Sequence, residues 1–341
     1  MEQRYIGHED QLLKARRVTF RDGLSDGVKA IELQNRQGLY ATCIEDQCLN
    51  LFDFSYKGIN FAFQSKNGLV SNSFFRGGTN EFLWYWPAGM LFTSGLTNTG
   101  PGGLMKDGLY HAEHGRIGMM PATDVAISRN DSGITVTGTV QDALLTGYRL
   151  ELKRTLHFPA DGKEITIEDV VTNREPQAME YALLYHINLG YPLLTPDARI
   201  VRGAGGGYDS ISGGALPADW AACKEPEDHK TEELFCHENT PDEDGFGYAA
   251  LLNEPLGLGC YVKYDMRTLP LLLHWKNMCT HDYVIGLEPS NNHNLGRDKE
   301  REHGTLPVLQ GYESVKFRVA IGVLDGKEEM DAFETMVNAL K

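Results

Sequence analysis

Residues 148–158 of the chain, YRLELKRTLHF, place apolar and polar side chains at alternate positions. This period of two is typical of a strand that buries one face. A turn follows at residues 159–162, PADG, and the alternation returns over residues 164–171, so the two runs predict a β-hairpin. Comparable strand patterns cover residues 30–33, 39–44, 49–54, 134–140, 179–187, 258–264, 271–275, 283–287 and 315–323. No strand–helix–strand rhythm separates them, and the sequence therefore predicts an all-β fold, a large antiparallel sandwich with few short helices.

The C-terminal segment predicts a helix. After Asp325-Gly326, apolar residues recur at steps of three and four, which is the spacing of a helix with one buried face. These residues are Met330, Phe333, Met336, Val337 and Leu340. We expect this helix to cap an edge of the sheet or the end of a barrel.

The composition limits the class of protein. The chain has 341 residues, 41% hydrophobic and 23% charged, which is enough for a large buried core. Its formal charge of −15 argues against nucleic acid as a partner, because an acidic surface repels phosphates. No stretch approaches the roughly 18 apolar residues of a membrane span, so we expect a cytoplasmic protein without a membrane partner. Six scattered cysteines without a CxxC pair predict free thiols and neither disulfides nor a metal site.

Two segments interrupt the strand rhythm. Residues 224–244 carry nine acidic residues against two lysines, which predicts a solvated excursion outside the core. Residues 76–103 interleave aromatic residues with glycines, which predicts a long loop. Its aromatic side chains are expected either to pack over a sheet edge or to line a pocket.

Three segments place polar side chains in an apolar or turn setting. Residues 181–192, YALLYHINLGYP, form a nearly continuous apolar strand that contains His186. A histidine there needs either a buried partner or a cavity. Residues 284–292, VIGLEPSNN, place Glu288 at the exit of an apolar strand, where the following proline holds the backbone extended. Each residue alone is explained as well by a structural or solvated side chain.

The third segment, residues 110–116, reads YHAEHGR. Its two histidines match neither the HExxH zinc helix nor a cupin-like HxH arrangement, so we expect no metal. His114 and Arg116 flank a glycine that permits close backbone approach, and both side chains offer donors to an oxygen-rich ligand. One carboxylate and two histidines near strand ends are the groups that acid–base catalysis requires.

Taken in order, these segments resemble the aldose 1-epimerase (galactose mutarotase-like) superfamily, in particular a divergent bacterial branch. The likeness rests on residues 93–96 (TSGL), 114–116 (HGR), 185–192 (YHINLGYP) and 287–289 (LEP), and it spans about residues 70–320. The resemblance implies one galactose mutarotase-like domain over residues 1–341, a β-supersandwich with a sugar cleft on its concave sheet. Typical mutarotases differ after both histidines, and this difference leaves the identity of the sugar open.

The resemblance also implies roles for individual residues. Glu288 would be the base, His186 the acid and His114 a residue that orients the ligand. We expect Glu288 to face His186 across a gap about one pyranose ring wide. Such a ring-opening reaction needs no cofactor and no metal, and its partner is a small-molecule sugar. The sequence leaves open whether the protein is a monomer or a homodimer.

Further residues are predicted to bind the sugar from their position near these segments. Trp84, Trp86, Tyr191 and Trp275 are candidates for the apolar wall, and Asn188, His274, Lys276, Asn277 and Asn291 are candidate hydrogen-bond donors. Arg116 and Arg76 could hold a carboxylate, sulfonate or phosphate in a bidentate contact, so an anionic sugar is one option. Two other functions stay open: a carbohydrate-binding protein without turnover, and another sugar isomerase or lyase on the same scaffold.

Overall fold

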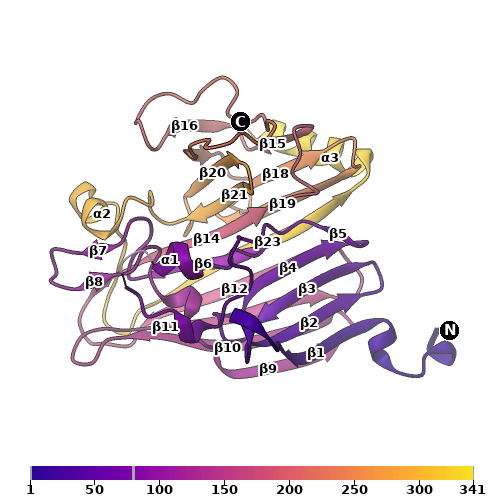
Figure 1. Cartoon of the computed structure of the whole chain (residues 1–341), viewed down its shortest axis with the longest axis horizontal. Helices are drawn as coiled ribbons and strands as arrows, with labels where there is room; N and C mark the ends of the chain where they lie inside the picture. The colour runs from indigo at the N-terminus through magenta and orange to yellow at the C-terminus, as the bar shows by residue number, and fades with distance from the viewer. Residues whose placement is uncertain (1, 79–80, 341) are drawn as a thin grey trace.

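Two large antiparallel sheets form the body of the computed structural model, which describes residues 2–78 and 81–340 (Figure 1). The larger sheet has eleven strands, ordered β1-β2-β3-β4-β6-β14-β21-β20-β17-β16, with β5 paired to β4. Their bounds are β1 Leu13–Thr19, β2 Lys29–Asn35, β3 Leu39–Ile44, β4 Asn50–Tyr56, β5 Ile59–Asn60, β6 Leu91–Leu96, β14 Ala182–Leu189, β16 Gly205–Asp209, β17 Glu233–Asn239, β20 Leu271–Cys279 and β21 Asp282–Ser290.

The second sheet has eight strands in the order β15-β18-β19-β23-β12-β11-β10-β9. Their bounds are β9 Thr123–Asn130, β10 Gly133–Ala143, β11 Arg149–Pro159, β12 Glu164–Asn173, β15 Ala198–Arg202, β18 Phe246–Asn253, β19 Leu258–Asp265 and β23 Ser314–Asp325. Two short ribbons complete the strands: β7 Gly103–Leu104 with β8 Tyr110–His111, and β13 Met179–Glu180 with β22 Val308–Leu309.

Helices are few and short in the described part of the chain. The α-helices are α1 Glu81–Tyr85, α2 Arg297–His303 and α3 Lys327–Ala339, and the 3₁₀ turns are η1 Glu2–Tyr5, η2 Glu9–Gln11, η3 Gly23–Ser25, η4 Asn72–Phe74 and η5 Ile117–Met119. The all-β antiparallel prediction is therefore confirmed, together with the C-terminal helix. None of these helices is long and apolar enough to cross a membrane.

The hairpin predicted at residues 148–171 is β11 paired with β12, and its inward-facing residues belong to the core between the sheets. One inward position holds a charge. Arg154 is fully buried and makes a bidentate ion pair with Asp169, at 2.9 and 2.6 Å. The same pair reaches the opposite sheet, because Tyr185 donates to Asp169 at 2.7 Å and Arg154 donates to Thr93 Oγ1 at 2.8 Å. A buried charge needs such complete pairing, so this network fixes how the two sheets are placed against each other.

Three predictions of local structure need correction. Residues 179–187 are not one strand, because β13 pairs with β22 while β14 lies in the large sheet. Residues 224–244 are not wholly a solvated excursion, since they contain β17, whose Phe235 and Cys236 are buried. Residues 76–103 are not one loop, since they contain α1 and β6, with residues 79–80 outside the described part.

Helix α3 packs across the outer face of the eight-stranded sheet. Its Met330, Phe333 and Val337 form a small core with residues of β15, β18 and β23. The helix was expected to cap an edge of the sheet. It covers the edge strand β15 and also the inner strands β18 and β23, because its apolar side needs a wide apolar surface to cover it. At the opposite end of the chain, the N-terminal segment extends away from the body (Figure 1).

Candidate functional site

Strands β14 and β21 are neighbours in the middle of the eleven-stranded sheet, and they bring His186 and Glu288 together. Their register pairs Leu184 with Ser290 and Asn188 with Gly286, which places His186 opposite Glu288. Alternation along β14 sends Tyr185 and its odd-numbered neighbours into the core between the sheets, and it sends His186 to the other face. Cross-strand partners of this kind lie side by side on one face of a sheet.

His186 and Glu288 are in contact. His186 Nδ1 lies 3.2 Å from Glu288 Oε1, so the expected gap of one pyranose ring between the two side chains is wrong. The physical reason is the cross-strand pairing, which leaves no room for a ring between the two groups. A sugar must therefore lie over the pair instead of between its members.

Asn188 fixes the imidazole of His186. The side-chain amide of Asn188 donates to Gly89 O at 2.9 Å and to His186 O at 3.0 Å, which identifies its other atom as the acceptor oxygen. That oxygen lies 2.5 Å from His186 Nδ1, so Nδ1 carries the hydrogen. The second ring nitrogen, Nε2, is the one left to exchange a proton with a ligand.

Glu288 is almost completely buried, with 1% of its surface exposed. Its Oε1 has no hydrogen-bond partner in the described part of the chain, although it lies 3.2 Å from His186 Nδ1, whose hydrogen is directed to Asn188. Gly286 makes room for this carboxyl, since a Cβ at that position would lie 2.2 Å from Glu288 Oε1. Any side chain at position 286 would therefore collide with the carboxyl of Glu288.

His114 arrives from a turn that is fixed by its glycine neighbour. His114 and Gly115 both have positive φ, at 56° and 73°, and Gly115 bridges to Gly95 of β6. A Cβ on Gly115 would lie 1.9 Å from Gly95 O, so only glycine permits this approach. The turn places the His114 ring 5.5 Å from that of His186, centroid to centroid.

Burial shifts the protonation of all three groups toward their uncharged forms. It lowers the pKa of His114 to about 4, and it lowers the pKa of His186 well below its ordinary value, with His114 as a second cause. Burial, helped by the charge of Glu232, raises the pKa of Glu288 well above its ordinary value. The close approach of His186 to Glu288 favours the charged forms, but desolvation outweighs it because both groups are almost fully enclosed.

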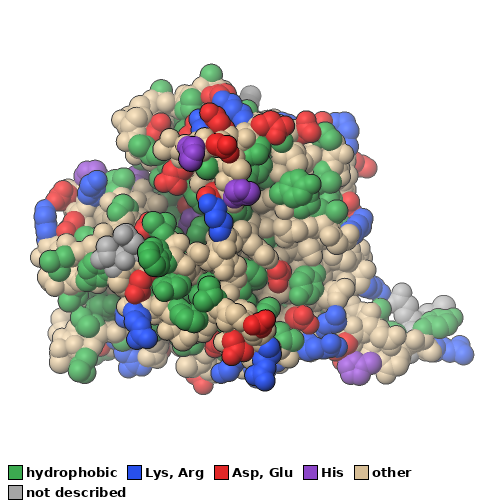
Figure 2. All heavy atoms as spheres, in the orientation of Figure 1, with side chains coloured by type: hydrophobic (Ala, Val, Ile, Leu, Met, Phe, Trp, Pro, Cys, Tyr) green, Lys and Arg blue, Asp and Glu red, His purple; other side chains and the backbone are tan. Residues whose placement is uncertain are grey.

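These three side chains line one cavity of about 280 Å³. Its walls are aromatic. Between ring centroids, His186 lies 5.0 Å from Trp86 and 5.4 Å from Trp275, and Phe82 of α1 lies 4.8 Å from His114. An apolar wall with a few convergent polar groups is the usual make-up of a small-molecule site. Hydrophobic side chains also gather on the surface beside α1 (Figure 2), where Leu83 and Trp84 are exposed.

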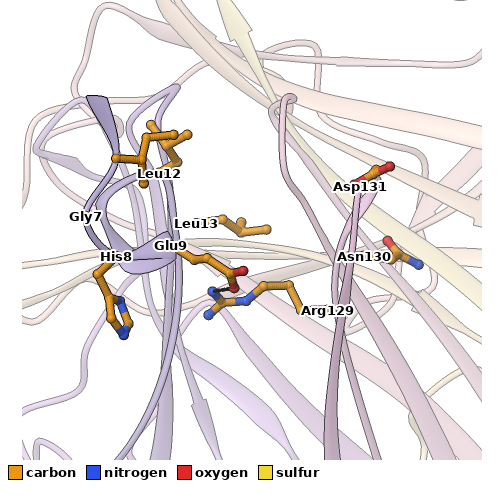
Figure 3. A pocket seen from close by; sticks show the side chains of 9 residues that line it. Gly7, His8, Glu9, Leu12, Leu13, Arg129, Asn130 and Asp131 are labelled. Carbon is orange, nitrogen blue, oxygen red and sulfur yellow. Dashed lines mark hydrogen bonds and ion pairs between the residues drawn. The ribbon is translucent and has the colours of Figure 1, made fainter. Parts of the chain in front are cut away.

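A larger hollow of about 580 Å³ lies between the N-terminal segment and the end of β9 (Figure 3). It is lined by the ion pair of Glu9 with Arg129, whose atoms are 3.0 Å apart, and by Leu12 and Leu13. Its lining contains neither a buried carboxyl nor a pair of convergent histidines. We therefore regard the smaller cavity as the functional candidate.

Two arginines predicted to bind the ligand lie elsewhere. Arg116 does not line the cavity; its guanidinium pairs with the fully buried carboxylate of Asp142, while Gly77 packs against its side chain. Arg76 is exposed in the segment before α1 and does not line the cavity either. The suggestion of an anionic sugar rested on these two residues, and the geometry gives it no support from them.

Lys276 and His274 lie on the opposite face of β20 from Trp275. They point into the interior of the sandwich, where Lys276 Nζ donates to Asp219 O at 3.5 Å and His274 Nδ1 lies 3.4 Å from Nε2 of His237 on the neighbouring strand β17. The side-chain period of two in a strand separates them from the cavity. Of the predicted aromatic wall, Trp86 and Trp275 line the cavity, whereas Trp84 and Tyr191 are exposed to solvent.

Asn188 is buried and acts on His186, not on the cavity itself. Sequence reasoning missed Phe82, Glu113 and Glu232, which do line it. Glu113 stands next to His114 and could have been found from that position. Glu232 belongs to the acidic segment before β17, and no local pattern distinguishes it from its neighbours.

The described part of the chain contains no group of three or more His, Cys, Asp or Glu side chains placed to hold a metal ion. His111, the second histidine of the segment 110–116, pairs with Asp107 at 2.9 Å. Five of the six cysteines are buried, and Cys279 is partly exposed.

Solved structures share this fold. A "putative aldose 1-epimerase" from Klebsiella pneumoniae subsp. pneumoniae MGH 78578 is similar with a TM-score of 0.89 and 23% identity, over 96% of this chain and 87% of the other. A galactose mutarotase-like protein from Clostridium acetobutylicum has a TM-score of 0.65 and 14% identity, over 92% and 99%. The galactose 1-epimerase from Lactobacillus acidophilus NCFM has a TM-score of 0.61 and 14% identity, over 92% and 100%.

At these identities the similarity establishes the fold and not the reaction. No curated protein matches the chain. A family model described as "Domain of unknown function (DUF4432)" matches residues 25–323, most of the chain. The chain has the galactose mutarotase-like fold and belongs to the DUF4432 family.

Proposed function

We propose that the protein is an aldose 1-epimerase-like isomerase, which interconverts the anomers of a sugar by acid–base ring opening. The observation that carries the proposal is the contact of His186 with Glu288 on the floor of an aromatic-walled cavity that His114 also lines. The single cavity supplies an acid–base pair, an apolar wall for sugar C–H groups and a further histidine for hydroxyl groups.

The chemistry fits two groups that touch each other. Ring opening removes the proton from the anomeric hydroxyl, adds a proton to the ring oxygen, breaks the bond between carbon 1 and the ring oxygen, and forms a carbonyl. Both oxygens are bonded to carbon 1, so an acid and a base lying side by side can reach them together. After rotation about the bond between carbons 1 and 2, the reverse proton transfers close the ring on the other face. No electrons are gained or lost.

Glu288 and His186 need to share only one mobile proton for this cycle. Burial favours the arrangement in which that proton is on Glu288 and His186 is neutral, with Nε2 free of hydrogen. The charged arrangement, with Glu288 as the base and His186 as the acid, has the same number of protons. When ring opening starts from protonated Glu288 and neutral His186, it leaves both side chains charged. Ring closure then returns the proton to Glu288 and leaves His186 neutral again. We assign the orientation of the sugar hydroxyls to His114.

Anomer exchange measured by NMR magnetization transfer on a panel of neutral, amino and anionic sugars tests the proposal. Glu288→Gln keeps the size of the side chain and removes the titrating group, so exchange should fall by about 10²–10⁴-fold toward the spontaneous rate. Glu328→Gln is the matched control, because it makes the same substitution at an exposed position of α3. This variant should exchange anomers at the wild-type rate.

Three results would contradict the proposal. Exchange no faster with wild-type protein than with Glu288→Gln, across the whole panel, would refute the activity. Sugar binding without faster exchange would indicate a carbohydrate-binding protein. Solvent deuterium appearing at a carbon atom would indicate a keto-sugar isomerase or a lyase, because anomer exchange leaves carbon-bound hydrogens in place.

A further inference from the structure

The residues that line the cavity carry an unbalanced charge. Glu113 and Glu232 bring two carboxylates to the lining beside the protonated Glu288, and none of the lining residues is Lys or Arg. Because aromatic walls exclude water and lower the local polarity, charges at such a site act more strongly than they would at an open surface. The cavity is therefore built to disfavour an anion.

Glu113 is partly buried at the side of the cavity and has neither an ion pair nor a hydrogen bond to its carboxylate from the described residues. Burial, together with the charge of Glu232, raises the pKa of this carboxyl. A half-buried carboxylate without a partner is costly, and a cationic group in the cavity would relieve that cost.

Glu232 is held at the rim by the aromatic wall. Trp275 Nε1 donates to Glu232 Oε2 at 2.8 Å, which orients the carboxylate, and no lysine or arginine of the described chain pairs with it. Its negative charge acts on both Glu113 and Glu288, so the three carboxyl groups share one neighbourhood.

Buried atoms on the same cavity point independently to a polar ligand. His114 is nine-tenths buried and its Nδ1 has no hydrogen-bond partner among the described residues, and the same holds for Oε1 of Glu288. Native proteins rarely leave such atoms unpaired, so this cavity is shaped for a ligand and is not merely an acidic surface.

We propose that the sugar bound here carries a protonated amino group, which Glu113 and Glu232 hold while the anomeric carbon lies over the Glu288–His186 pair. An ammonium group offers three donors, enough for both carboxylates, and the faces of Trp86 and Trp275 favour a cation beside them. The proposal rests on the proposed function and narrows its substrate to amino sugars. It replaces the anionic sugar suggested by Arg116 and Arg76.

The test compares hexoses bearing an amine at carbon 2, 3, 4 or 6 with the parent hexose and with a hexuronate, each corrected for spontaneous exchange. For at least one amine position, kcat/KM should exceed that of the parent by about tenfold, the size of one charge-assisted hydrogen bond, and the hexuronate should be the poorest substrate. In the Glu113→Gln/Glu232→Gln double variant the ratio of amine to parent should fall close to one. Glu328→Gln should leave the ratio unchanged.

Two outcomes overturn this inference alone. One is exchange of the parent hexose at least as fast as that of all four amines; the other is a ratio that persists in the double variant. If wild-type protein accelerates the anomer exchange of no sugar, the proposed function fails. The preference for a cationic sugar is then tested by binding alone, with calorimetric titration of each amine sugar and of its parent hexose into Glu288→Gln. Tighter binding of an amine than of its parent, lost in the triple variant that adds Glu113→Gln and Glu232→Gln, would still support the selection, and equal binding would refute it.

Discussion

The two faces of strand β20 each lie against buried histidines, but only one face carries a candidate site. On the cavity side, Trp275 stands beside the cleft cluster, which we define as His114, His186 and Glu288. On the side facing the other sheet lies the inner cluster, which we define as His237, His274 and Lys276. Both clusters are almost closed to solvent.

The histidines of the two clusters have similar electrostatics. Burial lowers the pKa of His237 to about 2 and that of His274 to about 3, beyond the value of about 4 for His114. The clusters differ in their neighbours. The inner histidines stack on each other and lie at tilted or edge-on angles to Trp220, with Lys276 adding positive charge beside His274, and no carboxyl of the described residues pairs with either histidine. A strongly shifted histidine is thus not a catalytic indicator by itself; the contacting carboxyl and the cavity are what distinguish the cleft cluster.

Exchanging one histidine in each cluster for glutamine should separate the two clusters most strongly. His186→Gln removes the proton-exchanging nitrogen, and we expect anomer exchange to fall by about 10²–10⁴-fold. His274→Gln should keep the wild-type exchange rate and lower the melting temperature instead, because it disturbs a packed interior. Equal losses of exchange in both variants, at temperatures where both are folded, would remove the distinction.

The turn that delivers His114 should be the next most sensitive feature, because nothing comparable holds the inner cluster, whose histidines come from regular strands. Gly115→Ala forces a Cβ against Gly95 O and should cost about 2–3 kcal/mol of unfolding free energy, with slower exchange. Gly27→Ala is the matched control: φ is 85° there, but nothing lies within 4 Å, so about 1 kcal/mol is expected from the backbone alone. Chemical denaturation of both variants measures the difference; equal costs would show that the close approach to β6 is unimportant.

Asn188 should affect the reaction through His186 and has no equivalent in the inner cluster. Asn188→Leu removes the acceptor that fixes Nδ1–H, and we expect kcat to fall by about tenfold, the worth of one strong hydrogen bond. Asn188→Asp keeps an acceptor and adds a negative charge, which should raise the pKa of His186 and move the pH profile of kcat upward. An unchanged pH profile in Asn188→Asp, with the protein folded, would contradict a positioning role.

The inner cluster should be visible in the pH dependence of stability. The pKa of His274 is about 3 in the folded protein and near its ordinary value of about 6.5 when unfolded, so the unfolded chain binds the extra proton between these values. The contribution of this histidine is therefore complete above about pH 6.5 and is lost as the pH falls. His274→Gln should reduce the slope of unfolding free energy against pH by about 1 kcal/mol per pH unit between pH 5 and 6. Identical slopes in urea titrations of both proteins would refute the burial argument.

Much of the fold was predictable because it depends on local pattern. The period of two in residues 148–171 produced the β11–β12 hairpin, and the helical spacing near the C-terminus produced α3. Residues 179–187 misled the prediction, because one apolar run serves two different sheets and nothing in its pattern marks the break. The acidic segment misled it as well, since β17 is short and its charged flanks dominate the composition.

For the site as well, predictions that depend on a local segment agree with the structure, and predictions that depend on distant partners or on the face of a strand do not. His114, His186 and Glu288 were identified from their segments and from family resemblance, and the structure places all three on one cavity. Arg116 was misjudged because its buried partner Asp142 lies 26 residues away in sequence, which no short motif reveals. Lys276 was misjudged because a shift of one residue along a strand changes the face of the sheet.

The class of fold and the kinds of chemical group available follow from the amino-acid sequence. Side-chain periodicity distinguishes strand from helix, and residue type limits which side chains can move a proton. The contact of His186 with Glu288, the presence of Glu113 and Glu232 in the same cavity and the absence of Arg116 from its lining depend on the folded arrangement. These contacts depend on strand register and on distant loops. A pattern of neighbours along the chain can predict a hairpin, but it does not show which distant strands pair, and a cavity exists only after those strands have paired.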